Sequence, residues 1–202
     1  MPPESFALRQ RTQRNLASNG LRNCLTRDNI SPRDFFKLAH GEIKKYGVVV
    51  KRAEIVHAKK LPTDIFLVKD EKGLNYYSKK LLLTTGLNDN IPPIKGIDNF
   101  YGKSIFHCPY CDGWEVKEKL IGVYAKNKNG FERAVELKTW SKHVTLYTDK
   151  RHYLKPQEID VQKKKNIRVV SEKITSVEGA TGKVSNIVFA NNKKERCDAL
   201  FL

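Results

Sequence analysis

Residues 107–116 read His107-Cys108-Pro109-Tyr110-Cys111-Asp112-Gly113-Trp114-Glu115-Val116. They place two cysteines within reach of one another and an acid directly after the second. A Cys-x-x-Cys pair can close into a small disulfide ring, in which one sulfur attacks a partner disulfide and the other resolves the mixed intermediate. The carboxyl group of Asp112 stands where it could pass a proton to or from a leaving thiolate. The stretch therefore predicts a redox site with Cys108, Cys111 and Asp112 as its catalytic residues.

Two other interpretations of the cysteine pair stay open. Half of a zinc site would need a second Cys or His pair at ligand spacing, and Cys24 and Cys197 are isolated in the sequence. A structural disulfide or a chance spacing is the other alternative. Within the loop, Pro109 is expected to stiffen the chain and Gly113 to supply a backbone shape that other residues adopt only at a cost. His107 is a candidate to tune one of the thiols.

The string Cys-x-x-Cys-Asp-Gly resembles the redox loop of thioredoxin reductases, which are FAD-dependent pyridine nucleotide-disulfide oxidoreductases. The longer string from Phe106 to Val116 is similar to a thioredoxin-reductase-like branch that includes dithiol oxidases, and the match extends from about Arg14 to the end of the chain. The resemblance implies FAD as cofactor, Cys111 as the sulfur nearest the flavin, and a cytoplasmic oxidoreductase. It also implies a thioredoxin-like protein or a small disulfide or dithiol as partner, and it hints at a homodimer. Which sulfur attacks the partner is left open.

Composition limits the other classes of function. Forty per cent of the 202 residues are apolar, which suits a globular protein with one large core or two small ones. No apolar run reaches the ~20 residues that cross a bilayer, and the start lacks the apolar core of a signal peptide, so we expect a cytoplasmic protein with no membrane partner. The net charge is +16. Because the basic residues are dispersed and no nucleic-acid module accompanies them, we expect solvated surfaces and no nucleic-acid partner.

The first half of the chain predicts an incomplete FAD-binding domain, over residues 1–102. Residues 1–30 are polar and irregular, with no expected strand, and the chain has no Gly-x-Gly-x-x-Gly. The resemblance therefore implies that the first strand, the phosphate loop and the first helix are absent, and that a final flavin-binding segment is missing after the last residues. It transfers the remaining cofactor contacts to Asn15, Ile55, Thr85 and Gly86.

Local patterns predict the elements of this domain. Ser31-Pro32-Arg33-Asp34 should open a helix that Gly47 ends. Residues 48–50 should form a buried strand, and three apolar runs over residues 55–77 a small antiparallel meander. Leu81-Leu82-Leu83 should lie in the middle of a parallel sheet and end at Thr85-Gly86, and residues 91–96 should be a stiff linker.

The second half, residues 103–202, predicts a domain that resembles an NAD(P)-binding domain and carries the redox loop. Strands are expected at 120–125, 144–148 and 167–170, a helix at 131–140, and a hairpin over 174–189 with Gly182 in its turn. The fold class is thus α/β, with two Rossmann-like units built on a three-layer parallel sheet with an inserted antiparallel meander, the first unit incomplete.

NADPH is the least certain partner that the resemblance implies. The turn Lys126-Asn127-Lys128-Asn129-Gly130 should hold Gly-x-Gly-x-x-Ala to receive a pyrophosphate, but only Gly130 is present and is read as misplaced. Lys150-Arg151 could replace the arginine cluster that meets a 2′-phosphate only loosely. One alternative is therefore a flavin-linked dithiol oxidase or disulfide reductase that does not use NADPH. Another is an inactive fragment without flavin.

Overall fold

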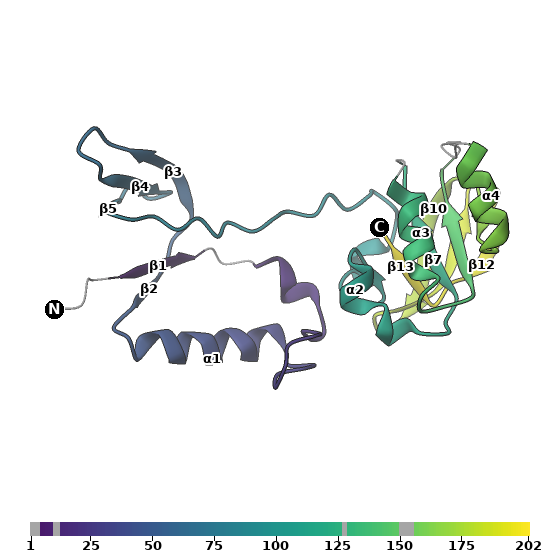
Figure 1. The fold of residues 1–202 in the computed structure, drawn as a ribbon, viewed down its shortest axis with the longest axis horizontal. Coiled ribbons are helices and arrows are strands. Elements are labelled where there is room, and N and C mark those ends of the chain that lie inside the picture. Colours follow the sequence, from purple (N-terminus) through teal and green to yellow (C-terminus); the bar gives the residue numbers. More distant parts are fainter. Residues whose placement is uncertain (1–4, 10–12, 127–128, 150–155) are drawn as a thin grey trace. The chain divides into compact units, whose positions relative to one another are not determined.

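A computed structural model describes residues 5–9, 13–126, 129–149 and 156–202 of the chain (Figure 1). The chain divides into two compact units. Unit 1 comprises Met1–Leu16 and Ile30–Asp89, and unit 2 comprises Ala17–Asn29 and Asn90–Leu202. Within the described ranges, no helix is both long enough and apolar enough to span a membrane.

Helix α1 of unit 1 spans Pro32–Lys44 and begins where the sequence predicted. The Ser31 hydroxyl accepts a hydrogen bond from the backbone N–H of Asp34 at 3.1 Å, and Pro32 takes the first helical position. Beyond the helix, Gly47 has a φ of 74°, a left-handed conformation that glycine adopts without strain. The predicted start and stop of this helix are both confirmed.

The N-terminal region contains a strand that the sequence analysis did not expect. Strand β1, Phe6–Arg9, pairs in parallel with β2, Val49–Arg52, and α1 lies between them in the chain. The expectation of no strand within residues 1–30 is therefore wrong. A short apolar run can form a strand when the chain after a helix returns as its parallel partner, which completes a βαβ unit.

Two apolar runs of unit 1 are not buried as predicted. Val49 is 48% exposed, because β1 and β2 form a two-stranded sheet of their own. Residues 81–83 form no strand, and Leu82 and Leu83 are 85% and 68% exposed. A central parallel strand needs hydrogen-bonding neighbours on both sides, and no described strand takes that place here. Unit 1 therefore exposes apolar side chains that its sequence pattern would bury.

The predicted meander is confirmed as a separate antiparallel sheet of three strands. It consists of β3 (Ile55–Lys60), β4 (Phe66–Asp70) and β5 (Asn75–Ser78). The carboxylate of Asp70 organises the second turn, because it accepts hydrogen bonds from the backbone N–H groups of Lys72 and Leu74 at 3.0 and 2.9 Å.

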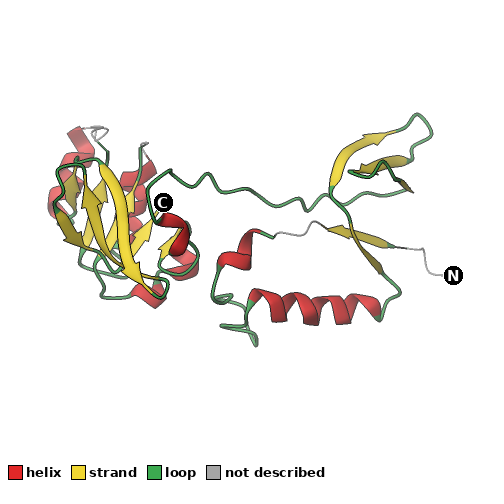
Figure 2. Cartoon of the chain, turned by 180° about the vertical axis from the view of Figure 1, so that it is seen from behind, coloured by secondary structure: helices red, strands yellow, loops and turns green. Residues whose placement is uncertain are grey.

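Unit 2 is built on a five-stranded parallel sheet in the order β6-β13-β7-β8-β9. Its strands are β6 (Ile105–Phe106), β7 (Ile121–Tyr124), β8 (Val144–Tyr147), β9 (Arg168–Val170) and β13 (Ala199–Phe201). Helices α3 (Asn129–Leu137) and α4 (Pro156–Lys164) lie on one side of it in Figure 1. Figure 2, from behind, shows the antiparallel sheet of β10 (Ile174–Ala180), β11 (Lys183–Phe189) and β12 (Lys194–Arg196) in front.

These three layers enclose two apolar cores. Along β13, Leu200 faces the core shared with the antiparallel sheet, whereas Ala199 and Phe201 face the core shared with α3. The alternation is the two-residue period of a strand covered on both faces. The strands expected near 121, 144 and 168, the helix near 131 and the hairpin at Gly182, whose φ is 76°, are confirmed. Strand β13 and helix α4 were not predicted.

Candidate redox site

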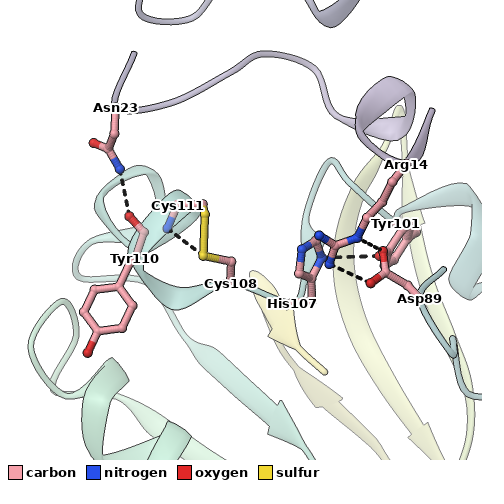
Figure 3. Close-up of a disulfide and its surroundings, with 8 residues drawn as sticks. All are labelled: Arg14, Asn23, Asp89, Tyr101, His107, Cys108, Tyr110 and Cys111. Carbon is pink, nitrogen blue, oxygen red and sulfur yellow. Dashed lines mark hydrogen bonds and ion pairs between the residues drawn. A yellow bond between two sulfur atoms is a disulfide. The ribbon is translucent and has the colours of Figure 1, made fainter. Parts of the chain in front are cut away.

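The redox loop follows the buried strand β6 and forms a single helical turn, α2, over Pro109–Asp112 (Figure 3). Cys108 is the N-cap residue, with φ −118° and ψ 106°, and Pro109 takes the first helical position. A 3-10 helix, η3, continues over Trp114–Val116. Because proline has the φ of a helix start and no N–H to satisfy, the sequence Cys-Pro sets where the turn begins.

The structure joins Cys108 and Cys111 in a disulfide, with their Cα atoms 5.3 Å apart. The Sγ atom of Cys108 also accepts a hydrogen bond from the backbone N–H of Cys111 at 3.2 Å. Cys111 is exposed, whereas Cys108 is half-buried. An external thiolate can therefore reach Cys111 more easily, and the amide would stabilise negative charge on Cys108. Of the residues that the structure describes, no group of three or more His, Cys, Asp or Glu could hold a metal ion.

Asp112 is half-buried beside the disulfide. Burial raises the pKa of its carboxyl group from 3.8 to about 6, while the charge of Arg22 lowers that pKa and the charge of Glu115 raises it. A carboxyl group with a pKa near 6 can hold a proton and release it close to neutral pH, which suits an acid and base for a thiolate.

Gly113 is required for its small size and not for its backbone conformation. Its φ of −62° and ψ of −37° are those of an ordinary helix, so the expectation of an unusual backbone shape is wrong. A Cβ atom here would lie 2.5 Å from the carbonyl oxygen of Pro109 and 2.6 Å from the ring of Trp140. The glycine lets the end of α2 pack against that ring.

The loop is also held by a segment distant in sequence, Ala17–Asn29, which we call the arm. The arm folds with unit 2, although the residues on both sides of it in the chain fold with unit 1. The Nδ2 atom of Asn23 donates a hydrogen bond to the carbonyl oxygen of Tyr110 at 2.9 Å (Figure 3). The Nε atom of Arg22 lies 3.6 Å from the Oε1 atom of Glu115. Sequence reasoning missed both arm residues, because nothing local marks a contact across almost ninety positions.

His107 is paired away from the sulfurs in the contacts described for it. Its Nδ1 atom lies 3.3 Å from the hydroxyl oxygen of Tyr101, and the two rings are stacked with centroids 6.2 Å apart. The suggestion that His107 tunes a thiol stays a prediction.

The four residues predicted to contact FAD all belong to unit 1. Asn15 lies exposed in the 3-10 helix η1 (Arg14–Ala17), and Ile55 begins β3. Thr85 and Gly86 are exposed in a segment without regular structure. The guanidinium of Arg14 binds both carboxylate oxygens of Asp89 at 2.6 Å, which ties η1 to the segment that carries Thr85 and Gly86.

This arrangement fits only part of a flavin dinucleotide. The pyrophosphate of such a cofactor is received by the amides of a glycine-rich turn before a helix, and the 202 residues contain no Gly-x-Gly-x-x-Gly. The open space around Gly86, where an added Cβ would meet nothing within 4 Å, leaves room for a ligand's flank. The residues present therefore do not by themselves fit the whole cofactor.

The region expected to bind NADPH is described only in part, because Asn127, Lys128, Lys150 and Arg151 lie outside the described residues. Gly130 is better placed than predicted: counted from Ala125, it takes the third glycine position of Gly-x-Gly-x-x-Gly. A Cβ atom on it would lie 2.3 Å from that of Ala125, so it permits the close helix–strand packing which this third position serves. The first two glycine positions hold alanine and asparagine.

An ion pair lies at the same edge of the sheet. The Nζ atom of Lys126 is 2.7 Å from the Oδ2 atom of Asp149, and the Tyr124 hydroxyl donates to that oxygen at 3.2 Å. The other carboxylate oxygen of Asp149 and the hydroxyl of Thr148 are buried without a hydrogen-bond partner. Both follow β8 at its carboxyl end, where ligands of such sheets bind.

A Rossmann-type sheet that carries a Cys-x-x-Cys disulfide beside an acid defines a disulfide oxidoreductase. No protein-family model matches the chain. A probable thioredoxin reductase of Arthroderma benhamiae is 28% identical over 142 residues, or 67% of this chain and 35% of that protein. Thioredoxin reductase tcpT of Claviceps purpurea is 35% identical over 130 residues, or 60% of this chain and 40% of that protein. The chain thus spans well under half the length of these curated relatives.

The crystal structure of TrxB from Bacillus anthracis, assigned as a thioredoxin reductase, has a TM-score of 0.89 and 27% identity. It is matched over 97% of this chain and 66% of that chain. The homologues of this chain are thus thioredoxin reductases, an oxidoreductase family, and its fold is thioredoxin-reductase-like. The predicted family and fold class are confirmed.

Proposed function

We propose that the chain carries the redox site of an FAD-dependent disulfide or dithiol oxidoreductase of the thioredoxin reductase type. The observation that carries this proposal is the disulfide between Cys108 and the exposed Cys111, beside an acid whose pKa is near 6. Residues 1–102 would belong to the FAD-binding domain and residues 103–202 to the domain with the redox loop. Asn15, Ile55, Thr85 and Gly86 would touch the flanks of the cofactor, which accepts or supplies two electrons when bound.

The chemistry of the loop itself is thiol–disulfide exchange. A thiolate of the substrate attacks the Sγ atom of Cys111, the bond between the two loop sulfurs breaks, and Cys108 leaves as a thiolate stabilised by the Cys111 amide. Protonated Asp112 gives its proton to that leaving sulfur. A second substrate thiolate then attacks the substrate sulfur of the mixed disulfide, and Cys111 leaves. The substrate dithiol is oxidised by two electrons, and the loop becomes a dithiol.

In the opposite direction the same steps reduce a disulfide. The substrate would be a thioredoxin-like protein or a small molecule with a disulfide or dithiol, in a reducing compartment such as the cytoplasm. A homodimer remains an expectation from the resemblance.

The test uses the 202-residue chain with Cys24→Ser, so that the buried Cys197 is the only other thiol. Thiol counting after mild reduction should show two additional thiols, and Cys108→Ser should leave Cys111 able to form a stable mixed disulfide with an added aromatic disulfide. Cys111→Ser should react more slowly, because Cys108 is half-buried. Zinc bound tightly by the two cysteines, or a disulfide that mild reductants cannot open, would refute the proposal.

One observation favours a second candidate, a flavin-linked dithiol oxidase or reductase that does not use NADPH. Lysine and asparagine occupy most of the turn at residues 126–130, and the Lys126–Asp149 ion pair lies at the edge where a dinucleotide would bind. An NADPH titration of a flavin-loaded, longer form of this protein separates the two candidates. Rapid bleaching of the flavin by NADPH would exclude the second one.

A further inference from the structure

The arm, Ala17–Asn29, is a compact loop with its own internal hydrogen bonds. The backbone N–H of Asn29 donates to the carbonyl oxygen of Leu21 at 2.7 Å, and that of Arg27 donates to Cys24 at 2.8 Å. The backbone N–H of Asn23 donates to the carboxylate of Asp28 at 3.1 Å. These bonds give the arm a defined shape, so its side chains are presented in fixed positions.

The arm contacts the redox loop on both sides of Cys111 and Asp112. Asn23 holds the carbonyl oxygen of Tyr110, which precedes them, and Arg22 pairs with Glu115, which follows them. A second bond fixes the guanidinium of Arg22, since its Nη1 atom donates to the Oδ1 atom of Asn29 at 2.6 Å. The side chain of Arg22 is 22% exposed, so its charge is only partly screened by water.

We propose that Arg22 is a positioning residue of the redox site, and that the Arg22–Glu115 pair controls the charge on Asp112 from outside the Cys-x-x-Cys loop. This proposal rests on the function proposed above, in which Asp112 exchanges protons with a loop sulfur. It adds a role for the arm, which neither the sequence motif nor the Cys-x-x-Cys geometry assigns.

The two partners act on Asp112 in opposite directions. The positive charge of Arg22 favours the ionised carboxylate, and the negative charge of Glu115 disfavours it. Those two are the charged groups that act on Asp112, from the arm and from η3; Trp140, which packs at the end of α2, is neutral. The pair therefore sets a balance: removing one charge moves the protonation midpoint of Asp112 one way, and removing the other moves it back.

The experiment is a pH titration of the Asp112 carboxyl carbon by NMR in the oxidised 202-residue chain, with Asp112→Asn used to assign the signal. Arg22→Gln should raise the midpoint by about 0.5 to 1 pH unit, and Glu115→Gln should lower it by a similar amount. The double variant should return toward the parent value. Arg27→Gln is the matched control, because this arm residue is exposed and its guanidinium donates to the Thr26 carbonyl and not to an acid.

The outcomes separate this proposal from the proposed function. If Arg22→Gln and Glu115→Gln both leave the midpoint where Arg27→Gln leaves it, the role of Arg22 is refuted, whatever the cysteines do. If the midpoints move as expected but the disulfide cannot be reduced reversibly, the function is refuted and the electrostatic coupling stands. A shift in one direction for both single variants would indicate a structural change and would also overturn the proposal. As a further readout, the pH profile for reduction by dithiothreitol should move with the midpoint of Asp112.

Discussion

Replacing Asp112 by asparagine should stabilise unit 2 at neutral pH and have little effect in acid. Burial raises the pKa of this carboxyl group from 3.8 to about 6, with Arg22 opposing the rise and Glu115 adding to it. One pKa unit corresponds to about 1.4 kcal/mol, so ionised Asp112 costs the folded protein up to about 3 kcal/mol. Because Asp112 is partly in contact with water, we expect about 1–3 kcal/mol.

The sign follows from the protons that each state binds. The folded protein keeps the Asp112 proton up to about pH 6, whereas the unfolded chain releases it near pH 3.8. Between these values the folded state binds more protons, so the free energy of unfolding falls as the pH rises, and the loss is complete above about pH 7. Asparagine is neutral at every pH and has nearly the same size, so the variant does not incur this loss.

The assay is urea unfolding of both proteins at a series of pH values from about 3.5 to about 8. The difference in unfolding free energy should be near zero at the acid end and should grow through the window between pH 4 and 6. Asp98→Asn, which removes an exposed carboxyl group of the same unit, is the control and should show no such growth. A constant difference at all pH values, or an Asp112→Asn variant that is less stable at pH 8, would refute the reasoning.

Three further predictions concern size and ligands. Gly113→Ala should lower the unfolding free energy of unit 2 by about 1–3 kcal/mol in urea, because its methyl group would lie 2.5 Å from the Pro109 oxygen, whereas Gly41→Ala, with nothing within 4 Å, should not destabilise α1. Purified alone, the 202-residue chain should retain little flavin, because it has no glycine-rich turn for the pyrophosphate; a stoichiometric flavin band in its visible spectrum would contradict this. Calorimetry should find NADPH binding weaker than micromolar, so a measured free energy near about −8 kcal/mol would show that residues 126–130 do receive it.

The elements of unit 2 could be predicted because their signals are local. Strands β7 and β8 are short runs of apolar residues, α3 has a helical spacing of apolar residues, and Gly182 marks a hairpin turn. Ser31 and Pro32 in unit 1 likewise announce α1 through their own chemistry. In each case the information lies within a few residues of the element.

The errors fall where the outcome depends on a distant partner. Residues 81–83 are as apolar as a central strand, yet they form none, since a strand exists only when neighbouring strands bond to it. In β1, Phe6–Arg9 is too short to stand out, and its pairing is decided by the return of the chain at Val49. Strand β13 was overlooked for a similar reason, because its three residues acquire their place only between β6 and β7.

The redox site divides along the same line. Its reacting groups, Cys108, Cys111 and Asp112, are readable in the sequence because a disulfide ring and an adjacent acid require a fixed short spacing. The acidity of Asp112 is not readable, because it depends on burial and on Arg22, ninety positions away on the arm. A second chain with the same Cys-x-x-Cys-Asp-Gly string but a different residue at the position of Arg22 should therefore keep the chemistry and shift its pH dependence. Substituting Arg22 in this chain reproduces that difference with the motif intact.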